Sequence, residues 1–161
     1  MVHGLYNTNP VVYERKERRR HYSVVPADVD DQYTIDPISQ LEVFDHIRDI
    51  KDPEYPYSLE QLKVVTEDSV EINDSHNHLR VTFTPTKEGC PMVTTIGLCL
   101  RVKLMLSLPS RYKVDIRVAP GTHAHEAAVN KQLNDKERVA AALENPGLGE
   151  IIDQCLAPTY E

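Results

Sequence analysis

Apolar residues first recur at helical spacing after Asp36-Pro37, and four of them predict a helix with one apolar stripe: Ile38, Leu41, Phe44 and Ile47. We expect this helix to begin at Asp36-Pro37, because an aspartate accepts from a free backbone N–H and proline suits the first helical position. It should end before Lys51-Asp52-Pro53, because the residue preceding a proline avoids the helical conformation. Ser58 and Gln61 have the spacing of a capping box, which predicts a second, short helix.

Alternating apolar and polar residues then predict three strands. Segments 64–73 and 78–84 flank the turn-forming residues 73–77, so we expect an antiparallel hairpin. Residues 112–119 alternate in the same way. Between the second and third strands, an apolar face predicts a helix from Pro91 to about 107–109, and this face consists of Met92, Ile96, Cys99 and Val102. A strand–helix–strand crossover should make its two strands parallel.

The last forty residues predict helices only. Thr122 is the expected cap of a helix to about Leu133, and Asn134 of a helix from 135 to 144, which Asn145-Pro146-Gly147 should end. A short helix is expected at 151–156. The order predicts an α+β fold: a small single domain with a three-stranded mixed sheet packed with helices, and extra C-terminal helices. We divide the chain into a poorly ordered tail (1–34), an α+β core (35–120) and a C-terminal helical extension (121–161).

Charge narrows the choice of partner. The 161 residues carry 18 basic and 25 acidic side chains, a net charge of −7. The first 25 residues hold five basic and two acidic side chains, so the remainder carries −10. An acidic body argues against direct binding of nucleic acid or of an anionic membrane. The basic run Arg15–Arg20 is interpreted as a solvated tail, with a nuclear-localisation or acidic-partner patch as the alternative. No apolar run approaches a membrane span or a signal-peptide core, so we expect a cytosolic or nuclear protein.

Three cysteines exclude a disulfide scaffold and a self-contained four-cysteine metal site. Cys90 is the candidate reactive thiol. Its expected N-cap position would place the sulfur beside free N–H groups and the positive end of a helix dipole, which favours the thiolate. A cysteine that merely fills space is equally compatible with the pattern. The surrounding loop is typical of loops that present a site, and it contains Thr84, Pro85, Thr86, Gly89 and Pro91. Cys99 lies half a turn away on the apolar face and is expected in the core, and Cys155 is expected to be a core or mobile thiol.

Two further features are candidates for chemistry. The rigid acidic turn Asp52-Pro53-Glu54 either connects two helices or presents its carboxylates. The histidine pairs His76/His78 and His123/His125 lack the spacing of a helical metal motif, although His123 remains a partner or metal candidate. A nucleophilic pair of Cys90 with His123 or His125 stays open. The nucleophile-elbow, P-loop and dinucleotide-binding motifs are absent from the sequence.

Three segments together resemble a known family. They are the acidic turn at 52–54 with Pro56, the loop 84–91 with its single cysteine, and Gly121-Thr122-His123 followed by the block 130–145. This set resembles an animal member of the cytosolic iron–sulfur assembly targeting-factor family, the MMS-interacting eighteen-kilodalton type, whose core is the domain of unknown function fifty-nine. The resemblance covers roughly residues 36–156.

The resemblance implies a non-enzymatic component of the targeting complex that delivers iron–sulfur clusters to cytosolic and nuclear apoproteins. The implied partners are a WD-repeat propeller protein, a HEAT-repeat adaptor and the client apoproteins, and clients would link the chain to DNA metabolism and chromosome segregation. The family's reactive cysteine maps onto Cys90, its acidic turn onto Asp52, Pro53 and Glu54, and its animal-type segment onto Gly121, Thr122 and His123. A single cysteine cannot complete the ligand shell of a cluster, so a cluster bound through Cys90 would be transient, with no tightly bound cofactor.

Three function classes therefore stand at this point. The first is the targeting adaptor, the second is a cysteine-dependent enzyme using Cys90, and the third is a scaffold in chromosome-segregation or polarity complexes. We also expect a homodimer, with exchange of elements across the loop 84–90 or the strand after Pro109 as the possible mechanism. The expected location is the cytoplasm, with the nucleus as a second compartment.

Overall fold

A computed structural model of the 161-residue chain describes residues 10–14 and 38–160. The predicted three-stranded mixed sheet is confirmed, in the order β1 (Val70–Asn73), β2 (His78–Phe83) and β3 (Lys113–Val118). Strands β1 and β2 pair antiparallel as a hairpin, and β2 and β3 pair parallel in a register that sets Val81 opposite Ile116. Apolar residues alternate along β2, so one face of the sheet is buried and the other carries polar side chains.

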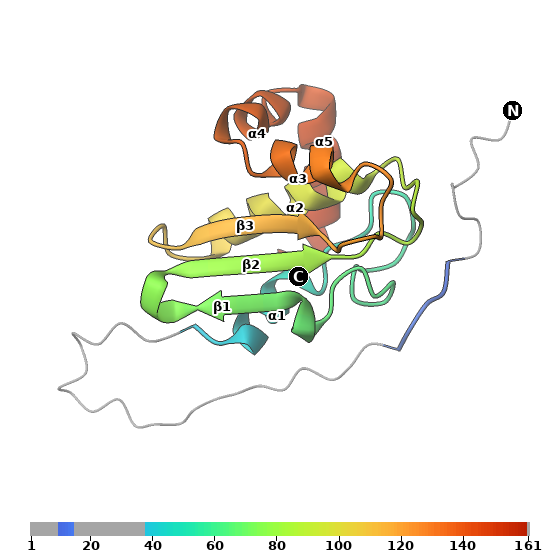
Figure 1. Cartoon of the computed structure of the whole chain (residues 1–161). Coiled ribbons are helices and arrows are strands. Elements are labelled where there is room, and N and C mark those ends of the chain that lie inside the picture. The colour runs from blue at the N-terminus through green and yellow to red at the C-terminus, as the bar shows by residue number, and fades with distance from the viewer. Residues whose placement is uncertain (1–9, 15–37, 161) are drawn as a thin grey trace, which may run out of the picture.

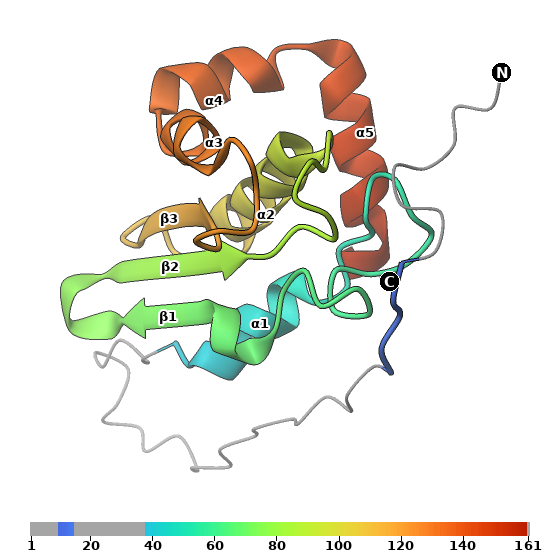
Figure 2. The ribbon, with the colours of Figure 1, turned by 45° about the vertical axis from the view of Figure 1, so that its right-hand side comes forward.

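Two helices cover the buried face of the sheet (Figure 1). Helix α1 (Gln40–Ile47) packs against β1, and the crossover helix α2 (Val93–Ser107) packs against β3. Three C-terminal helices follow: α3 (Glu126–Leu133), α4 (Lys136–Leu143) and α5 (Pro146–Leu156). Helices α3 and α5 both pack on α2, so their buried residues join the same hydrophobic cluster as the sheet (Figure 2). The α+β fold with C-terminal helices is therefore as predicted.

The side chain of Asn134 closes the outer edge of β3. Its amide group accepts from the backbone N–H of Ile116 at 3.0 Å and donates to the carbonyl oxygen of Ile116 at 2.8 Å, as a neighbouring strand would. Asn130 accepts from the N–H of Val118 at 2.7 Å. The edge of the sheet thus has side-chain partners in place of a fourth strand.

Several predicted helix starts are wrong by a few residues. Helix α1 begins at Gln40 with Ser39 as its cap, and the expected start at Asp36-Pro37 lies outside the described residues. Asp135, not Asn134, caps α4, because Asn134 is engaged with β3. Thr122 does not cap α3, and its hydroxyl donates to the carbonyl of Ala119.

Other predicted boundaries shift for local reasons. Asn145 ends α4 but also caps α5, which therefore starts at Pro146 and is longer than expected. The Ser58–Gln61 box forms, with hydrogen bonds of 2.9 and 3.1 Å, yet it closes only a turn because Lys63 adopts φ 52° and ends the helical path. The first strand is shorter than expected, because a 3₁₀ turn at Glu67–Ser69 precedes it. Short 3₁₀ turns also occur at Asp74–His76 and Ala157–Tyr160.

The described part of the N-terminal tail, residues 10–14, contacts the folded core. The backbone N–H of Tyr13 donates to the carbonyl of Gln61 at 2.6 Å, and the Lys63 ammonium lies 4.0 Å from the centre of the Tyr13 ring. The basic run Arg15–Arg20 lies outside the described residues. Among the helices that are described, none has the length and apolar character needed to cross a membrane.

Candidate functional site

The thiol of Cys90 lies at the end of the loop that leads from β2 to α2. Only 4% of the residue is exposed, and its backbone N–H donates to the carbonyl of Lys87 at 3.1 Å. Helix α2 begins at Val93 with Met92 at the cap position, so the predicted N-cap position of Cys90 is wrong by two residues. The backbone N–H of Met92 nevertheless favours the thiolate form of Cys90. The loop therefore places Cys90 just before the helix rather than on it.

The electrostatic surroundings of Cys90 favour the neutral thiol. Burial raises its pKa above the ordinary value, and the negative charges of Asp52 and Glu54 raise it further. The Met92 N–H lowers the pKa but is outweighed. The expectation of an activated thiolate is thus wrong for this conformation, because the sequence shows the nearby helix start but not the desolvation or the two carboxylates.

The acidic turn is the neighbour of this thiol. Asp52 is 2% exposed, and its Oδ1 accepts from the backbone N–H groups of Glu54 at 2.8 Å and Tyr55 at 3.0 Å. Burial raises the pKa of Asp52, while these two hydrogen bonds partly offset the effect. Pro53 is half-buried within the same turn. Both carboxylates act electrostatically on Cys90, so the structure brings together two segments that the sequence analysis selected separately.

His123 fixes the loop from its other side. Its Nε2 lies 3.1 Å from the carbonyl oxygen of Cys90, and its Nδ1 accepts from the backbone N–H of His125 at 3.0 Å. Because Nδ1 accepts, the ring proton resides on Nε2 and is donated to Cys90. The Ala124 N–H also donates to Glu88 at 3.0 Å, so two hydrogen bonds tie this segment to the thiol loop.

The Gly121-Thr122 turn positions that histidine after β3. Gly121 adopts φ +75°, a conformation that favours glycine, and its N–H donates to the Glu126 carboxylate at 2.7 Å. The Thr122 hydroxyl donates to Ala119 at 2.6 Å. These bonds reverse the chain and bring His123, which is 8% exposed, under the loop.

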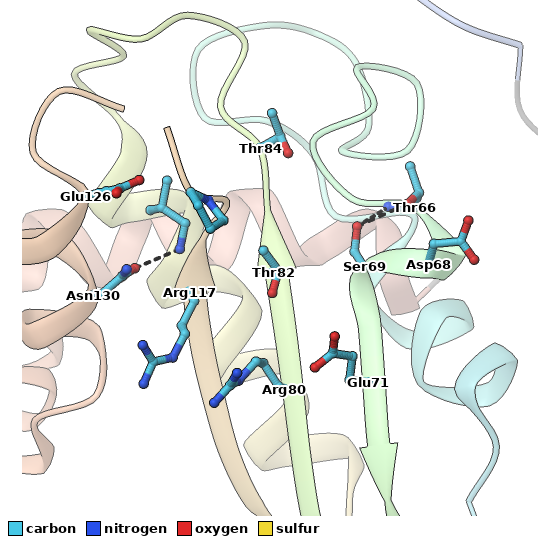
Figure 3. A pocket seen from close by; sticks show the side chains of 12 residues that line it. Thr66, Asp68, Ser69, Glu71, Arg80, Thr82, Thr84, Arg117, Glu126 and Asn130 are labelled. Carbon is cyan, nitrogen blue, oxygen red and sulfur yellow. Dashed lines mark hydrogen bonds between the residues drawn. The ribbon is translucent and has the colours of Figure 1, made fainter. Parts of the chain in front are cut away.

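The remaining loop residues have different surroundings. Pro85 is buried, Thr86 is half-buried, and Gly89 and Pro91 are exposed. Thr84 is exposed and lines a pocket of about 580 Å³ over the open sheet face, where Arg80 and Arg117 also lie (Figure 3). The predicted loop therefore contributes to two places: Thr84 lines this pocket, and the later residues of the loop lead to Cys90.

The arrangement around Cys90 is not that of a nucleophilic cysteine–histidine pair. One nitrogen of His123 donates to a backbone carbonyl and the other accepts from a backbone N–H, so neither is free to take the thiol proton. Within residues 10–14 and 38–160, no group of three or more Cys, His, Asp or Glu side chains could hold a metal ion. Cys99 is fully buried, as expected, and Cys155 is 2% exposed, so both lie in the hydrophobic core.

Comparison with known proteins places the chain in a family. Residues 40–118 match the family described as iron–sulfur cluster assembly protein. Over 97% of this chain and 98% of the relative, it is 65% identical to Protein AE7 of Arabidopsis thaliana. It is 55% identical to the MIP18 family protein galla-2 of Drosophila melanogaster, over 94% of each chain. The chain belongs to the MIP18 family of iron–sulfur cluster assembly proteins.

A further relative of this MIP18 family chain comes from a mammal. The chain is 50% identical to the cytosolic iron-sulfur assembly component 2B of Mus musculus, over 95% of this chain and 91% of the relative. The expected family is therefore confirmed. The similarity is not restricted to animals, because the plant relative is the most similar of the three.

The matched region of the MIP18 family chain runs from the start of α1 to the end of β3. It contains Asp52 and Cys90 but ends before His123. The sequence analysis missed one contact here, the buried ion pair of Arg48 with Glu60 at 2.5 Å. No local signal in the sequence identifies Glu60 as the partner of Arg48, because the two residues meet only when α1 and the following turn pack together.

Proposed function

We propose that the chain is a non-enzymatic component of the cytosolic iron–sulfur targeting complex, which delivers clusters to cytosolic and nuclear apoproteins. The observation that carries this proposal is similarity over nearly the whole chain to a mouse protein named cytosolic iron-sulfur assembly component 2B. A Dictyostelium discoideum relative with the same name is 41% identical over 93% of this chain. The engaged nitrogens of His123 and the raised pKa of Cys90 support a docking role over turnover.

The proposed partners are a WD-repeat propeller protein, a HEAT-repeat adaptor and client apoproteins. An acidic body suits protein partners better than nucleic acid, because phosphate neutralisation requires basic surface. We place the chain in the cytoplasm and, with its clients, in the nucleus, which would link it to chromosome segregation. A homodimer formed by exchange across the loop 84–90 or the strand after Pro109 belongs to the same proposal. Light scattering that shows only monomer at micromolar concentration would exclude the homodimer.

The cluster is treated as cargo, and Cys90 as a thiol that contacts it only during transfer. One buried thiol with a raised pKa does not fit a resident cluster site, which requires several deprotonated ligands. Transfer would require the loop 84–91 to expose the sulfur and the thiol to lose its proton. Anaerobic reconstitution should give iron–sulfur absorbance with the wild-type chain and less with Cys90→Ser.

Affinity purification of the full chain tests the adaptor role. Wild type, Cys90→Ser and a matched thiol control, Cys99→Ser, are tagged and expressed in the same cells. The propeller and the adaptor should copurify with all three, and maturation of client proteins should fail only with Cys90→Ser. Full client maturation with Cys90→Ser would exclude a role for this thiol, and absence of both partners would exclude the complex itself.

The enzymatic alternative has a separate test. A small thioester or peptide should remain unchanged by the wild-type chain even where iodoacetamide labels Cys90. Turnover that depends on Cys90 would establish the enzyme instead.

A further inference from the structure

Two arginines share one carboxylate on the open face of the sheet, the face that points away from α1 and α2. The Nε atoms of Arg80 on β2 and Arg117 on β3 donate to the same oxygen, Oδ2 of Asp115, at 3.0 and 2.8 Å. Asp115 lies opposite Arg80 in the parallel register and two residues before Arg117, so all three side chains share one face. The two arginine side chains are 40% and 46% exposed, and that of Asp115 is 14% exposed. Asp115 therefore holds the two guanidinium groups next to each other at the surface.

The outer ends of these guanidinium groups are available to a ligand. Both arginines use Nε for the contact with Asp115, and within the described part of the chain their Nη groups have no hydrogen-bond partner. A guanidinium presents its Nη groups in a fixed plane that matches the two oxygens of a carboxylate. Because Asp115 already orients both groups, less side-chain freedom is lost when an anion binds to them.

Both arginines line the pocket of about 580 Å³ over this face (Figure 3). The side chains of Thr82 and Thr84 follow Arg80 along the same strand and line the pocket with it. Most of the lining side chains are polar, unlike those of the apolar clefts that enclose small molecules. A polar surface that presents arginines is more typical of contact with another protein, where arginine is enriched.

Three further carboxylates restrict the shape of a ligand. Glu71 on β1 lies opposite Arg80 in the antiparallel register, and Asp68 lies in the turn before β1. Glu126 lines the opposite side, at the start of α3, where it accepts from the N–H of Gly121 at 2.7 Å. The arginines thus form a narrow basic strip between two acidic margins (Figure 3). A wide polyanion such as a nucleic acid would meet these margins, whereas a single extended row of carboxylates would not.

We propose that an extended acidic segment of a partner protein docks on this face of the sheet, with its side-chain carboxylates on Arg80 and Arg117. The chain carries a net charge of −7, so an acidic segment gains nothing from the overall charge and depends on these two side chains. The pocket reaches Thr84, the first residue of the loop 84–91, so the bound segment lies beside the base of the loop that carries Cys90. Docking here uses neither the thiol nor a cluster, and it does not depend on the proposed cluster transfer.

A synthetic peptide tests this docking surface. The probe is an eight-residue peptide in which glutamate alternates with serine, so that the carboxylates of the extended chain lie on one side. Its ends are acetylated and amidated, so only side chains carry charge. Amide spectra of the ¹⁵N-labelled full chain are recorded during a titration at low ionic strength, where screening is weakest. We expect saturable shifts at Thr82 and Arg117 and none along α5. The same peptide with glutamine in place of glutamate is the control and should cause no shift.

Substitution of the arginines separates this site from general attraction between charges. Arg80→Gln and Arg117→Gln should each weaken binding of the glutamate peptide by roughly 3–10-fold, and the double variant by more than about tenfold, because charge-assisted hydrogen bonds are lost. Arg138→Gln is the matched control. It removes the same charge from a side chain on α4 that is 54% exposed, and it should change the affinity by less than about twofold.

Several results would overturn the proposal. They are a wild-type spectrum that the glutamate peptide leaves unchanged, equal shifts with the glutamine peptide, and unchanged affinity in the double variant. An equal loss of affinity in Arg138→Gln would also overturn it, as would tighter binding of a single-stranded oligonucleotide of the same charge. The wild-type titrations with the two peptides and the oligonucleotide decide the question even where a variant fails to fold.

Discussion

The imidazole of His123 donates from Nε2 to the carbonyl oxygen of Cys90 at 3.1 Å, and its Nδ1 accepts from the backbone N–H of His125 at 3.0 Å. One side chain therefore joins the turn after β3 to the loop before α2. The contact reaches the backbone of Cys90 and not its sulfur. His123 accordingly sets the position of the thiol loop without taking part in proton transfer from the thiol.

Replacement of His123 by alanine should loosen that loop. His123→Ala removes two hydrogen bonds at a buried position, and we expect a loss of about 1–3 kcal/mol in the free energy of unfolding. Iodoacetamide should label Cys90 faster in the native state. Urea unfolding and native-state labelling measure the two effects. His125→Ala is the matched control, because it keeps the backbone N–H that His123 uses and its ring is exposed. Equal labelling rates in the two variants would contradict the positioning role.

Alkylation of Cys90 should depend on pH as expected for a thiol with a raised pKa. Only the thiolate reacts, so the native rate should stay below that of the unfolded chain at neutral pH and increase until the medium passes the raised pKa. Asp52→Asn keeps the Oδ1 acceptor of the turn and removes one of the charges that raise this pKa. The rate at fixed pH should increase by roughly 2–10-fold. Glu144→Gln is the control. Glu144 is exposed at the C-terminal end of α4 and is not among the charges that act on Cys90, so this variant should have no effect.

The same substitution has a separate effect on stability. Burial raises the pKa of Asp52 in the folded state, so its contribution to stability is complete below the pKa of the unfolded chain and is lost as pH rises through the folded pKa. At neutral pH the ionised carboxylate of Asp52 therefore lowers the free energy of unfolding. Asp52→Asn should raise the free energy of unfolding at neutral pH and lose this advantage in acid. Urea titrations at both pH values test the sign, and a less stable variant at neutral pH would contradict it.

Gly97 permits the close approach of α2 and α3. A Cβ at this position would lie 2.4 Å from Cδ1 and 2.8 Å from Cδ2 of Leu133, which is fully buried. Gly97→Ala should therefore reduce the free energy of unfolding by about 1–3 kcal/mol. In a double-mutant cycle with Leu133→Ala, the combined loss should be smaller than the sum of the single losses. Gly149→Ala is the control, because no heavy atom lies within 4 Å and alanine gains up to about 1 kcal/mol of helix propensity there. Strict additivity would argue against the clash.

Asn134 should matter more to the sheet than to the helix it precedes. Asn134→Ala leaves the N–H and C=O of Ile116 without their side-chain partner, and we expect a loss of about 1–3 kcal/mol. The amide of Ile116 should exchange with solvent faster than in the wild type. Lys131→Ala, at an exposed position on α3, should leave both quantities unchanged. Unchanged exchange at Ile116 in Asn134→Ala would show that the edge does not need this residue.

The sheet was predictable because its signal is local. Alternation in segments around Val81 and Ile116, together with a crossover of helical pattern, determines strand number and direction. The helix starts were harder, since several side chains able to cap lie next to one another. Asn134 and Asp135 are both good caps, and only the contact of Asn134 with β3 decides between them.

The candidate site was predictable in its members but not in its chemistry. Cys90, Asp52 and His123 were each identified from the sequence, and the structure places them together. The direction of the thiol pKa shift could not be predicted. It depends on burial and on carboxylates that reach Cys90 only through tertiary packing.

The parallel pairing of β2 with β3 has a consequence for synthesis on the ribosome. The β1–β2 hairpin is made first, and the whole of α2 must emerge before β3 can join. During that interval one edge of β2 has open N–H and C=O groups, which attract strands of other chains. Translation halted after Ser107 would release a chain with that edge exposed, so we expect nascent forms of this length to need a chaperone.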